Sequence, residues 1–321
     1  MDKNDQNRLA IAVLVPCYNE ETAIGQVIRE FRKALPTATV YVYDNGSDDR
    51  TIEVARNAGA IVRSERLRGK GNVVRRMLAD IDADVYLMVD GDATYDAASA
   101  PALVDKLVSE ALDMVVGSRI ESAVEAYRHG HRLGNAVLTG SVSYLFGKRF
   151  TDILSGYRAF SRRFVKSFPA LSRGFEIETE LTIHALELRM PVAEVPTPYG
   201  ARPAGSTSKL RTYADGFKIL VQILTLFKNE KPLQFFGGIS AFLALASVGL
   251  ALPIIVTYVE TGLVPRFPTA ILSSGIMILS FLSLTCGLVL DTVTRGRKEM
   301  KRLAYLLLSE RKTVEHFTSV V

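Results

Sequence analysis

The sequence contains no tryptophan and is poor in cysteine and histidine. Two cysteines are too few for a disulfide scaffold, and together with four histidines they exclude a cluster of Cys/His zinc sites. A signal peptide is not expected either, because the early apolar run Leu9–Val15 is short and ends at a proline. We therefore expect the N-terminal part of the chain to stay in the cytoplasm.

Apolar sequence is abundant instead: it makes up 48% of the 321 residues and includes two long uncharged stretches. Neither Phe235–Val259 nor Phe267–Leu290 holds an Asp, Glu, Lys, Arg or His. Each is long enough to cross a bilayer as a helix, which takes roughly 20 residues. A pair of buried core helices is the alternative. Basic residues flank the pair at Lys228, Lys231 and 295–302, so the positive-inside rule predicts both flanks in the cytoplasm.

These patterns divide the chain into four parts. We expect an α/β domain over 1–210, an amphipathic juxtamembrane helix over 211–231, a transmembrane hairpin over 232–292 and a basic cytoplasmic tail helix over 293–321. Packing against the α/β domain is the alternative for the amphipathic helix and for the tail. Within the first part, strand and helix patterns alternate, which predicts a mostly parallel sheet covered by helices.

Three polar clusters follow predicted strands, at residues 16–20, 44–48 and 90–92. Ligands of open parallel sheets bind beyond the carboxyl ends of the strands, so three clusters at one edge indicate a binding site. In the last cluster, Asp90 and Asp92 flank a glycine, and Mg²⁺ is commonly held by one or two carboxylates plus substrate phosphates. An Asp-rich turn without a metal is the alternative for this cluster.

Basic residues supply candidate anion sites. Lys70 stands between two glycines before a predicted helix, and Arg119 ends another predicted strand. Further cations lie at Arg128 and Arg132, and at Arg202 and Lys209 around a Gly-Ser-Thr-Ser loop. Solvated loops are the alternative for each of these clusters.

The motifs Val-Pro-Cys-Tyr-Asn-Glu at 15–20, Asp-Asn-Gly-Ser-Asp-Asp at 44–49, Gly-Lys-Gly-Asn at 69–72 and Asp-Gly-Asp at 90–92 resemble those of family 2 glycosyltransferases with a GT-A fold. Asp-Ile-Leu-Ser-Gly-Tyr-Arg at 152–158 and Gly-Ser-Thr-Ser-Lys-Leu at 205–210 are similar to the polyprenyl-phosphate branch, which includes dolichol-phosphate mannose synthases and bactoprenol glucosyltransferases. The resemblance covers about residues 10–225 and extends to the two-helix anchor.

The resemblance implies roles for these positions. Asp44 accepts a hydrogen bond from the nucleotide base, and Asp90 and Asp92 hold ribose and diphosphate through Mg²⁺ or Mn²⁺. Asp152 lies near the sugar or acts as base, and Arg158 buttresses it. The other residues of the nucleotide-sugar site are Pro16, Tyr18, Asn19, Glu20, Asn45, Lys70 and Glu178. The residues expected around the acceptor or leaving phosphates are Arg119, Arg128, Arg132, Arg202, Ser208 and Lys209.

The chain departs from the family pattern at two places. Asn45 stands where a second aspartate is usual, and Ala-Thr-Tyr-Asp at 93–96 replaces the Leu-Gln-His-Pro-Pro type of many mannose synthases. These departures favour a UDP-sugar over GDP-mannose as donor. The lack of tryptophan also excludes the Gln-x-x-Arg-Trp motif of processive polysaccharide synthases.

We therefore expect an inverting glycosyltransferase that moves a sugar from a nucleotide-sugar to a polyprenyl phosphate at the cytoplasmic face of the inner membrane. Transfer to another lipid, such as diacylglycerol, is the first alternative, and it needs a true base at Asp152. A non-catalytic nucleotide-sugar-binding scaffold is the second. The expected partners are the lipid bilayer, a separate flippase for the product and a second copy of the chain, with no nucleic acid.

Overall fold

The structure is a computed structural model, and it describes residues 9–121, 139–144, 147, 150–174, 176–200, 221 and 224–308. The chain divides into two compact units. The sheet unit comprises residues 1–216 and 301–321, and the hairpin unit comprises residues 217–300.

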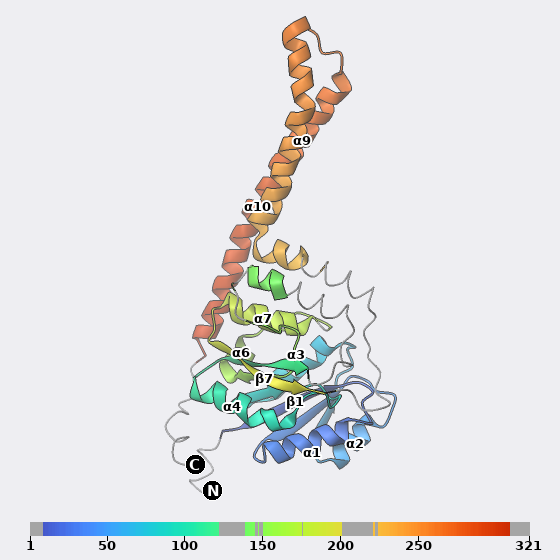
Figure 1. The fold of residues 1–321 in the computed structure, drawn as a ribbon, viewed down its shortest axis with the longest axis vertical. Helices are drawn as coiled ribbons and strands as arrows, with labels where there is room; N and C mark the ends of the chain where they lie inside the picture. Colours follow the sequence, from blue (N-terminus) through green and yellow to red (C-terminus); the bar gives the residue numbers. More distant parts are fainter. Residues whose placement is uncertain are drawn as a thin grey trace. The chain divides into compact units, whose positions relative to one another are not determined.

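The sheet unit alternates strands and helices, as the sequence pattern predicts (Figure 1). Its strands are β1 (Ile11–Cys17), β2 (Thr39–Asp44), β3 (Ile61–Ser64), β4 (Val85–Met88), β5 (Met114–Glu121), β6 (Arg158–Ser161) and β7 (Val192–Tyr199). Its helices are α1 (Ile24–Ala34), α2 (Thr51–Asn57), α3 (Lys70–Asp80), the 3₁₀ turn η2 (Ala97–Ser99), α4 (Ala100–Ser109), α6 (Arg162–Ser167) and α7 (Ile177–Glu187).

The seven strands form one sheet in the order β3-β2-β1-β4-β6-β5-β7. Every pairing is parallel except those of β6, which runs antiparallel to both β4 and β5. The predicted α/β class with a mostly parallel sheet is therefore confirmed. Strand β1 lies inside the sheet between β2 and β4 and is buried over most of its length, as its apolar run predicts.

Helices cover both faces of this sheet. Figure 1 shows α1, α2 and α4 on one face and α3, α6 and α7 on the other. The apolar stripe of α1, including Ile24, Ile28 and Phe31, packs with the side chains of β1 and α4 in the main core. This packing holds the strands rigid, so the loops at their carboxyl ends start from fixed positions.

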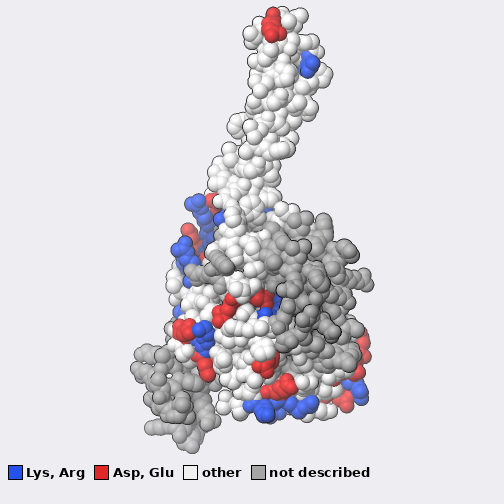
Figure 2. Space-filling view, viewed as in Figure 1, with Lys and Arg blue, Asp and Glu red and all other residues white. Residues whose placement is uncertain are grey.

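The hairpin unit contains α9 (Pro232–Thr261) and the first 34 residues of α10, which runs over Phe267–Leu306 and enters the sheet unit at Lys301. Both helices are long and apolar enough to cross a membrane. Gly262 ends α9 in the left-handed conformation (φ 70°), and its N–H donates to the carbonyl of Tyr258 at 2.8 Å. Figure 2 shows charged atoms at the tip of the hairpin and a long white stretch between the tip and the base.

The two helices of the hairpin meet through small polar residues. Ser240 and Ser247 of α9 are buried, as are Ser273, Ser280 and Gly287 of α10, so each set repeats every seven residues. The Ser280 hydroxyl donates to the Ser240 carbonyl at 2.8 Å, and the Ser247 hydroxyl donates to the Ser273 carbonyl at 2.7 Å. Large apolar side chains on both helices remain exposed.

The last turns of α10 belong to the sheet unit and contact its buried carboxylates. Lys301 Nζ pairs with the buried Glu187 carboxylate of α7 at 2.7 Å. The Tyr305 hydroxyl donates to Asp113, which is fully buried, at 2.7 Å, and the Arg163 guanidinium lies 4.6 Å from the centre of the Tyr305 ring. Buried carboxylates of the sheet unit therefore take partners from the end of α10.

Candidate active site

The three polar loops expected from the sequence follow β1, β2 and β4. These strands are neighbours in the sheet and run parallel, so their carboxyl ends lie at one edge. That edge is where open α/β sheets bind ligands. The structure therefore brings the three clusters together.

The first two loops are tied to each other by reciprocal hydrogen bonds. The Asn19 backbone N–H donates to the Ser47 hydroxyl at 2.8 Å, and the Asn19 side-chain oxygen accepts from the Asp48 N–H at 2.9 Å. Asn19 has φ of 52°, in the left-handed region that few residues other than glycine adopt. The Glu20 N–H donates to the Thr51 hydroxyl at 2.8 Å. These bonds fix one loop against the other.

Pro16 and Tyr18 occupy the end of β1 and the start of its loop. Pro16 lies opposite Tyr43 in the register with β2. The Tyr18 ring carries the Arg68 guanidinium, whose carbon lies 4.7 Å from the ring centre. This cation–π contact places a flat, positively charged surface at the predicted nucleotide site.

Asp44 and Asn45 shape the loops around the site. Asp44 is only 1% exposed, and its Oδ2 accepts from two backbone N–H groups of the following turn at 2.8 and 3.0 Å. The Asn45 side chain donates to the Leu67 carbonyl at 2.8 Å and accepts from the Gly69 N–H at 2.6 Å. Asn45 therefore clamps the segment before α3 to the end of β2, and Asp44 closes the turn on which Asn45 stands.

Lys70, the first residue of α3, lies between two carboxylates. Its Nζ forms an ion pair with Asp90 and a second one, at 2.5 Å, with Glu178 in the first turn of α7. Burial lowers the pKa of Lys70, but the two carboxylates outweigh burial, so that this pKa is raised. Burial raises the pKa of Glu178, and the Asp90 carboxylate adds to this rise, against the opposing effect of Lys70.

Asp92 lies in a tight turn. It is 5% exposed, and its Oδ1 accepts from the Thr94 hydroxyl at 2.6 Å. Ala93, between them, has φ of 56°, a costly conformation for alanine. Gly91 is needed because a Cβ there would lie 2.6 Å from the Cys17 sulfur. The chain is thus bent and closely packed at the second carboxylate of the motif.

The two carboxylates at this turn are oxygen donors, which a hard divalent cation prefers. They do not enclose a cation by themselves, since no group of three or more His, Cys, Asp or Glu side chains among the described residues could hold a metal. Asp90 and Asp92 provide two carboxylates, the number with which Mg²⁺ is held when substrate phosphates complete its coordination. The site therefore suits a cation that binds with a diphosphate.

Asp152 and Arg119 form a buried bidentate pair. Arg119 Nε donates to Asp152 Oδ2 at 2.6 Å and Arg119 Nη2 donates to Oδ1 at 2.8 Å. Burial raises the pKa of Asp152, but the hydrogen bonds and charge of Arg119 outweigh burial and hold that pKa below its ordinary value. The same guanidinium lies 5.4 Å from the centre of the Tyr199 ring, at the end of β7.

Arg158 holds the backbone of the preceding loop. It is fully buried, and its guanidinium donates to the carbonyls of Ser155 at 2.8 Å and Ile153 at 2.6 Å and to the Thr182 hydroxyl at 2.8 Å. Burial lowers the pKa of Arg158 to about 10, which leaves it charged at neutral pH. Arg158 thus acts on the loop that carries Asp152, and Arg119 makes the ion pair with the carboxylate itself.

Five of the expected phosphate-binding residues lie outside the described residues. They are Arg128, Arg132, Arg202, Ser208 and Lys209.

Tyr95 was not expected at the site from the sequence. Its hydroxyl oxygen accepts the Gly156 N–H at 2.8 Å, which joins the loop after Asp92 to the Ser-Gly-Tyr-Arg loop. Burial raises the pKa of Tyr95, so it stays a neutral phenol. The signal available in the sequence was its place three residues after Asp92.

Comparison with known proteins agrees with this geometry. Residues 12–168 match the family described as "Glycosyl transferase family 2". Glycosyltransferase AglJ of Haloferax volcanii is 35% identical over 300 residues, which cover 92% of this chain and 98% of that protein. A dolichyl-phosphate hexose transferase of the same organism is 33% identical over 69% of this chain and 95% of its own length.

A solved structure shares the fold. Glucosyl-3-phosphoglycerate synthase from Mycobacterium tuberculosis, in complex with Mn²⁺, UDP-glucose and phosphoglyceric acid, aligns with a TM-score of 0.56 at 24% identity. The alignment covers 70% of this chain and 81% of that one. The expected GT-A type of fold is therefore confirmed, and with the full-length similarity to AglJ the chain belongs to glycosyltransferase family 2.

Proposed function

We propose that this family 2 glycosyltransferase moves a hexose from a nucleotide-sugar to a polyprenyl phosphate at the cytoplasmic face of a membrane, with inversion at the anomeric carbon. The observation that carries the choice of acceptor is the bidentate pair between Arg119 and Asp152. Both carboxylate oxygens are engaged and the pKa of Asp152 is lowered, so Asp152 is a weak base.

A weak base suits a phosphate acceptor. A lipid phosphate at neutral pH already carries between one and two negative charges, so its oxygen attacks without losing a proton to the enzyme. A lipid hydroxyl, as in diacylglycerol, needs a group that removes its proton. The similarity to a dolichyl-phosphate hexose transferase supports the same choice.

The remaining task is to stabilise the leaving diphosphate. Asp90 and Asp92 would hold Mg²⁺ or Mn²⁺ there, and the cation would neutralise the charge that develops on the diphosphate. Asp152 holds the Arg119 guanidinium in one orientation, so that this cation would meet a phosphate without reorganising. Asn19, Asn45 and Tyr95 fix the loops on which these groups stand.

The hairpin supports a membrane location for the acceptor. Both α9 and α10 carry exposed large apolar residues, as expected for surfaces that contact lipid. We infer from the basic flanks that the sheet unit and both termini lie in the cytoplasm. Two spanning helices form no path for a lipid-linked sugar, so a separate flippase is part of the proposal, as is a homo-oligomer.

The test is a donor and acceptor screen on the full-length protein in detergent. UDP-glucose, UDP-galactose, UDP-N-acetylglucosamine and GDP-mannose are each offered with undecaprenyl phosphate and Mn²⁺ or Mg²⁺, and products are identified by mass spectrometry. We expect a polyprenyl-phosphate hexose from one donor. Asp92→Asn should lower its formation at least about 100-fold, because charge stabilisation of this kind is worth that much or more.

Asp105→Asn is the matched control, since Asp105 is exposed on α4, and it should keep full activity. Product with diacylglycerol and none with undecaprenyl phosphate would refute the proposal that the acceptor is a polyprenyl phosphate. Full activity of Asp92→Asn in EDTA would refute the metal site.

A further inference from the structure

The ion cluster of Lys70, Asp90 and Glu178 gathers groups from three separate elements. Lys70 begins α3, Asp90 follows β4, and Glu178 lies in the first turn of α7. The side chains of Lys70 and Glu178 are 10% and 5% exposed, and that of Asp90 is 30% exposed. Asp90 is therefore the member of the cluster that a ligand reaches.

The backbone around the cluster is packed too closely for side chains. A Cβ on Gly69 would collide with the carbonyl of Arg173, and one on Gly71 would collide with that of Ser172. Gly69 also has φ of 120°, which favours glycine. On the other side, a Cβ on Gly156 would lie 2.6 Å from Asp90 Oδ2. Glycines on both sides of Lys70 thus allow its ammonium to reach the two carboxylates.

An ammonium against Asp90 has a consequence for metal binding. A divalent cation held by Asp90 and Asp92 would lie close to the Lys70 ammonium, which already pairs with Asp90, and like charges repel strongly where water is scarce. Without substrate, Lys70 and the metal would therefore compete for the Asp90 carboxylate. A bound nucleoside diphosphate would add negative charge beside them and shift this balance toward the metal.

We propose that Lys70 is an internal counter-ion of the metal site: it keeps divalent-metal affinity low in the free enzyme and makes metal and nucleotide bind cooperatively. This inference rests on the proposed metal site. Lys70 is then a positioning residue, which sets when Asp90 becomes available. By thermodynamic linkage, the metal must raise nucleotide affinity by the same factor by which the nucleotide raises metal affinity.

The test measures binding without turnover. Mn²⁺ affinity of the nucleotide-free protein is read from the electron paramagnetic resonance of free Mn²⁺. Affinities for UDP and GDP are measured by calorimetry without metal and with saturating Mn²⁺. For the wild type we expect weak Mn²⁺ binding alone and a gain of at least about tenfold in affinity for one nucleotide when Mn²⁺ is present.

Lys70→Met should bind Mn²⁺ at least about tenfold more tightly without nucleotide, and its cooperativity should fall to about threefold or less. Lys70→Arg keeps the charge and should restore weak Mn²⁺ binding and the cooperativity. Lys106→Met, which breaks an ion pair between Lys106 on α4 and Glu110 just after that helix, is the matched control and should behave as the wild type. Lys70→Gln replaces Lys70→Met if the latter does not fold by circular dichroism.

Equal Mn²⁺ affinity and equal cooperativity in the wild type and in a folded Lys70→Met or Lys70→Gln would overturn the inference and leave the proposed function standing. Absence of Mn²⁺ binding to the wild type, even with UDP or GDP, would overturn the proposed metal site and the inference with it.

Discussion

The two units bury opposite kinds of residue. In the sheet unit the core is apolar, and the charges that it buries come in partnered groups such as Arg119 with Asp152. In the hairpin unit the buried positions between α9 and α10 are held mostly by serine, threonine and glycine, and the large apolar side chains are exposed. The two units are thus built for different surroundings.

The difference follows from what drives packing in each solvent. In water, apolar burial holds a domain together, and a buried charge is tolerated only with a partner. In lipid, apolar side chains gain nothing by leaving the solvent, so helices associate through small residues and hydrogen bonds. The arrangement of the hairpin therefore supports the proposal that lipid surrounds it.

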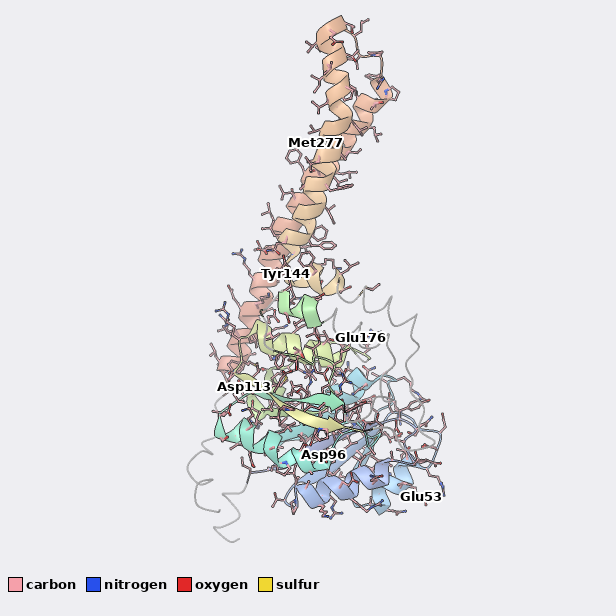
Figure 3. All side chains as sticks on the ribbon, viewed as in Figure 1. Glu53, Asp96, Asp113, Tyr144, Glu176 and Met277 are labelled. Atoms are coloured by element: carbon pink, nitrogen blue, oxygen red, sulfur yellow. The ribbon has the colours of Figure 1, made fainter. Side chains whose placement is uncertain are left out.

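The residues with which helix α10 packs change in kind along its length. Up to Thr294 its buried residues are small, whereas Lys301 and Tyr305 bind the buried carboxylates of Glu187 and Asp113. Figure 3 shows Asp113 and, on another side of the sheet unit, Glu176 at the start of α7. Helix α7 carries the site residue Glu178 in its first turn and ends at Glu187, the partner of Lys301.

The largest expected effect of a single substitution on stability comes from the buried charge of Arg158. Arg158→Met leaves the carbonyls of Ser155 and Ile153 without their donor in the core. Each buried acceptor that loses its donor costs about 1–3 kcal/mol in free energy of unfolding, and Arg158→Met leaves two such carbonyls. Urea unfolding in detergent, followed by far-ultraviolet circular dichroism, measures the loss.

Arg162→Met provides the comparison at the surface. Arg162 pairs at 3.0 Å with Asp82, whose side chain is 60% exposed. Exposed pairs contribute about 0–1 kcal/mol, so this variant should unfold almost as the wild type does. Equal losses in the two variants would contradict the role given to Arg158.

The second effect concerns the pH dependence of the Arg119–Asp152 pair. Asp152→Asn should lower the free energy of unfolding by about 2 kcal/mol at pH 7, because hydrogen bonds to charged groups contribute about 1.5–3 kcal/mol. The pKa of Asp152 is lowered in the folded protein, so its stabilisation is complete above the ordinary aspartate pKa and disappears as the pH falls through the lowered value. The difference between variant and wild type should therefore be constant from pH 8 to 5 and shrink below about pH 4.

Urea midpoints of both proteins at pH values from 8 down to about 3 check this behaviour. A difference that changes between pH 8 and 6 would mean that Asp152 titrates near neutrality. Asp152 would then be able to serve as a general base, and the hydroxyl-acceptor alternative would gain support.

Local patterns in the sequence predicted most of the helices and strands and the loops that carry the candidate site. The helical, charge-free stretches 235–259 and 267–290 lie inside α9 and α10, and the polar motifs follow β1, β2 and β4. These features depend on neighbours along the chain, which a sequence displays directly.

The partners within the site could not be predicted in the same way. Asp152 pairs with Arg119, 33 residues away, and Lys70 reaches Glu178 from another helix. Such contacts depend on how strands and helices are placed in space. The heptad spacing of Ser240, Ser247, Ser273 and Ser280 was visible in the sequence, but its meaning required the pairing of the two helices.

The smallest expected effect concerns a hydrogen bond between the two helices of the hairpin. Ser280→Ala removes the hydroxyl that bonds the Ser240 carbonyl at 2.8 Å. Hydrogen bonds between helices in membranes contribute about 0.6 kcal/mol on average, so we expect a loss of that size on unfolding in mixed micelles of increasing SDS content. Ser274→Ala is the matched control, because the exposed Ser274 hydroxyl bonds Ala270 of its own helix. A loss of several kcal/mol in Ser280→Ala would show that the contact between α9 and α10 depends on its buried hydrogen bonds as strongly as the core of the sheet unit does. A loss equal to that of Ser274→Ala would show that close approach of the helices, rather than the hydroxyl, holds them together.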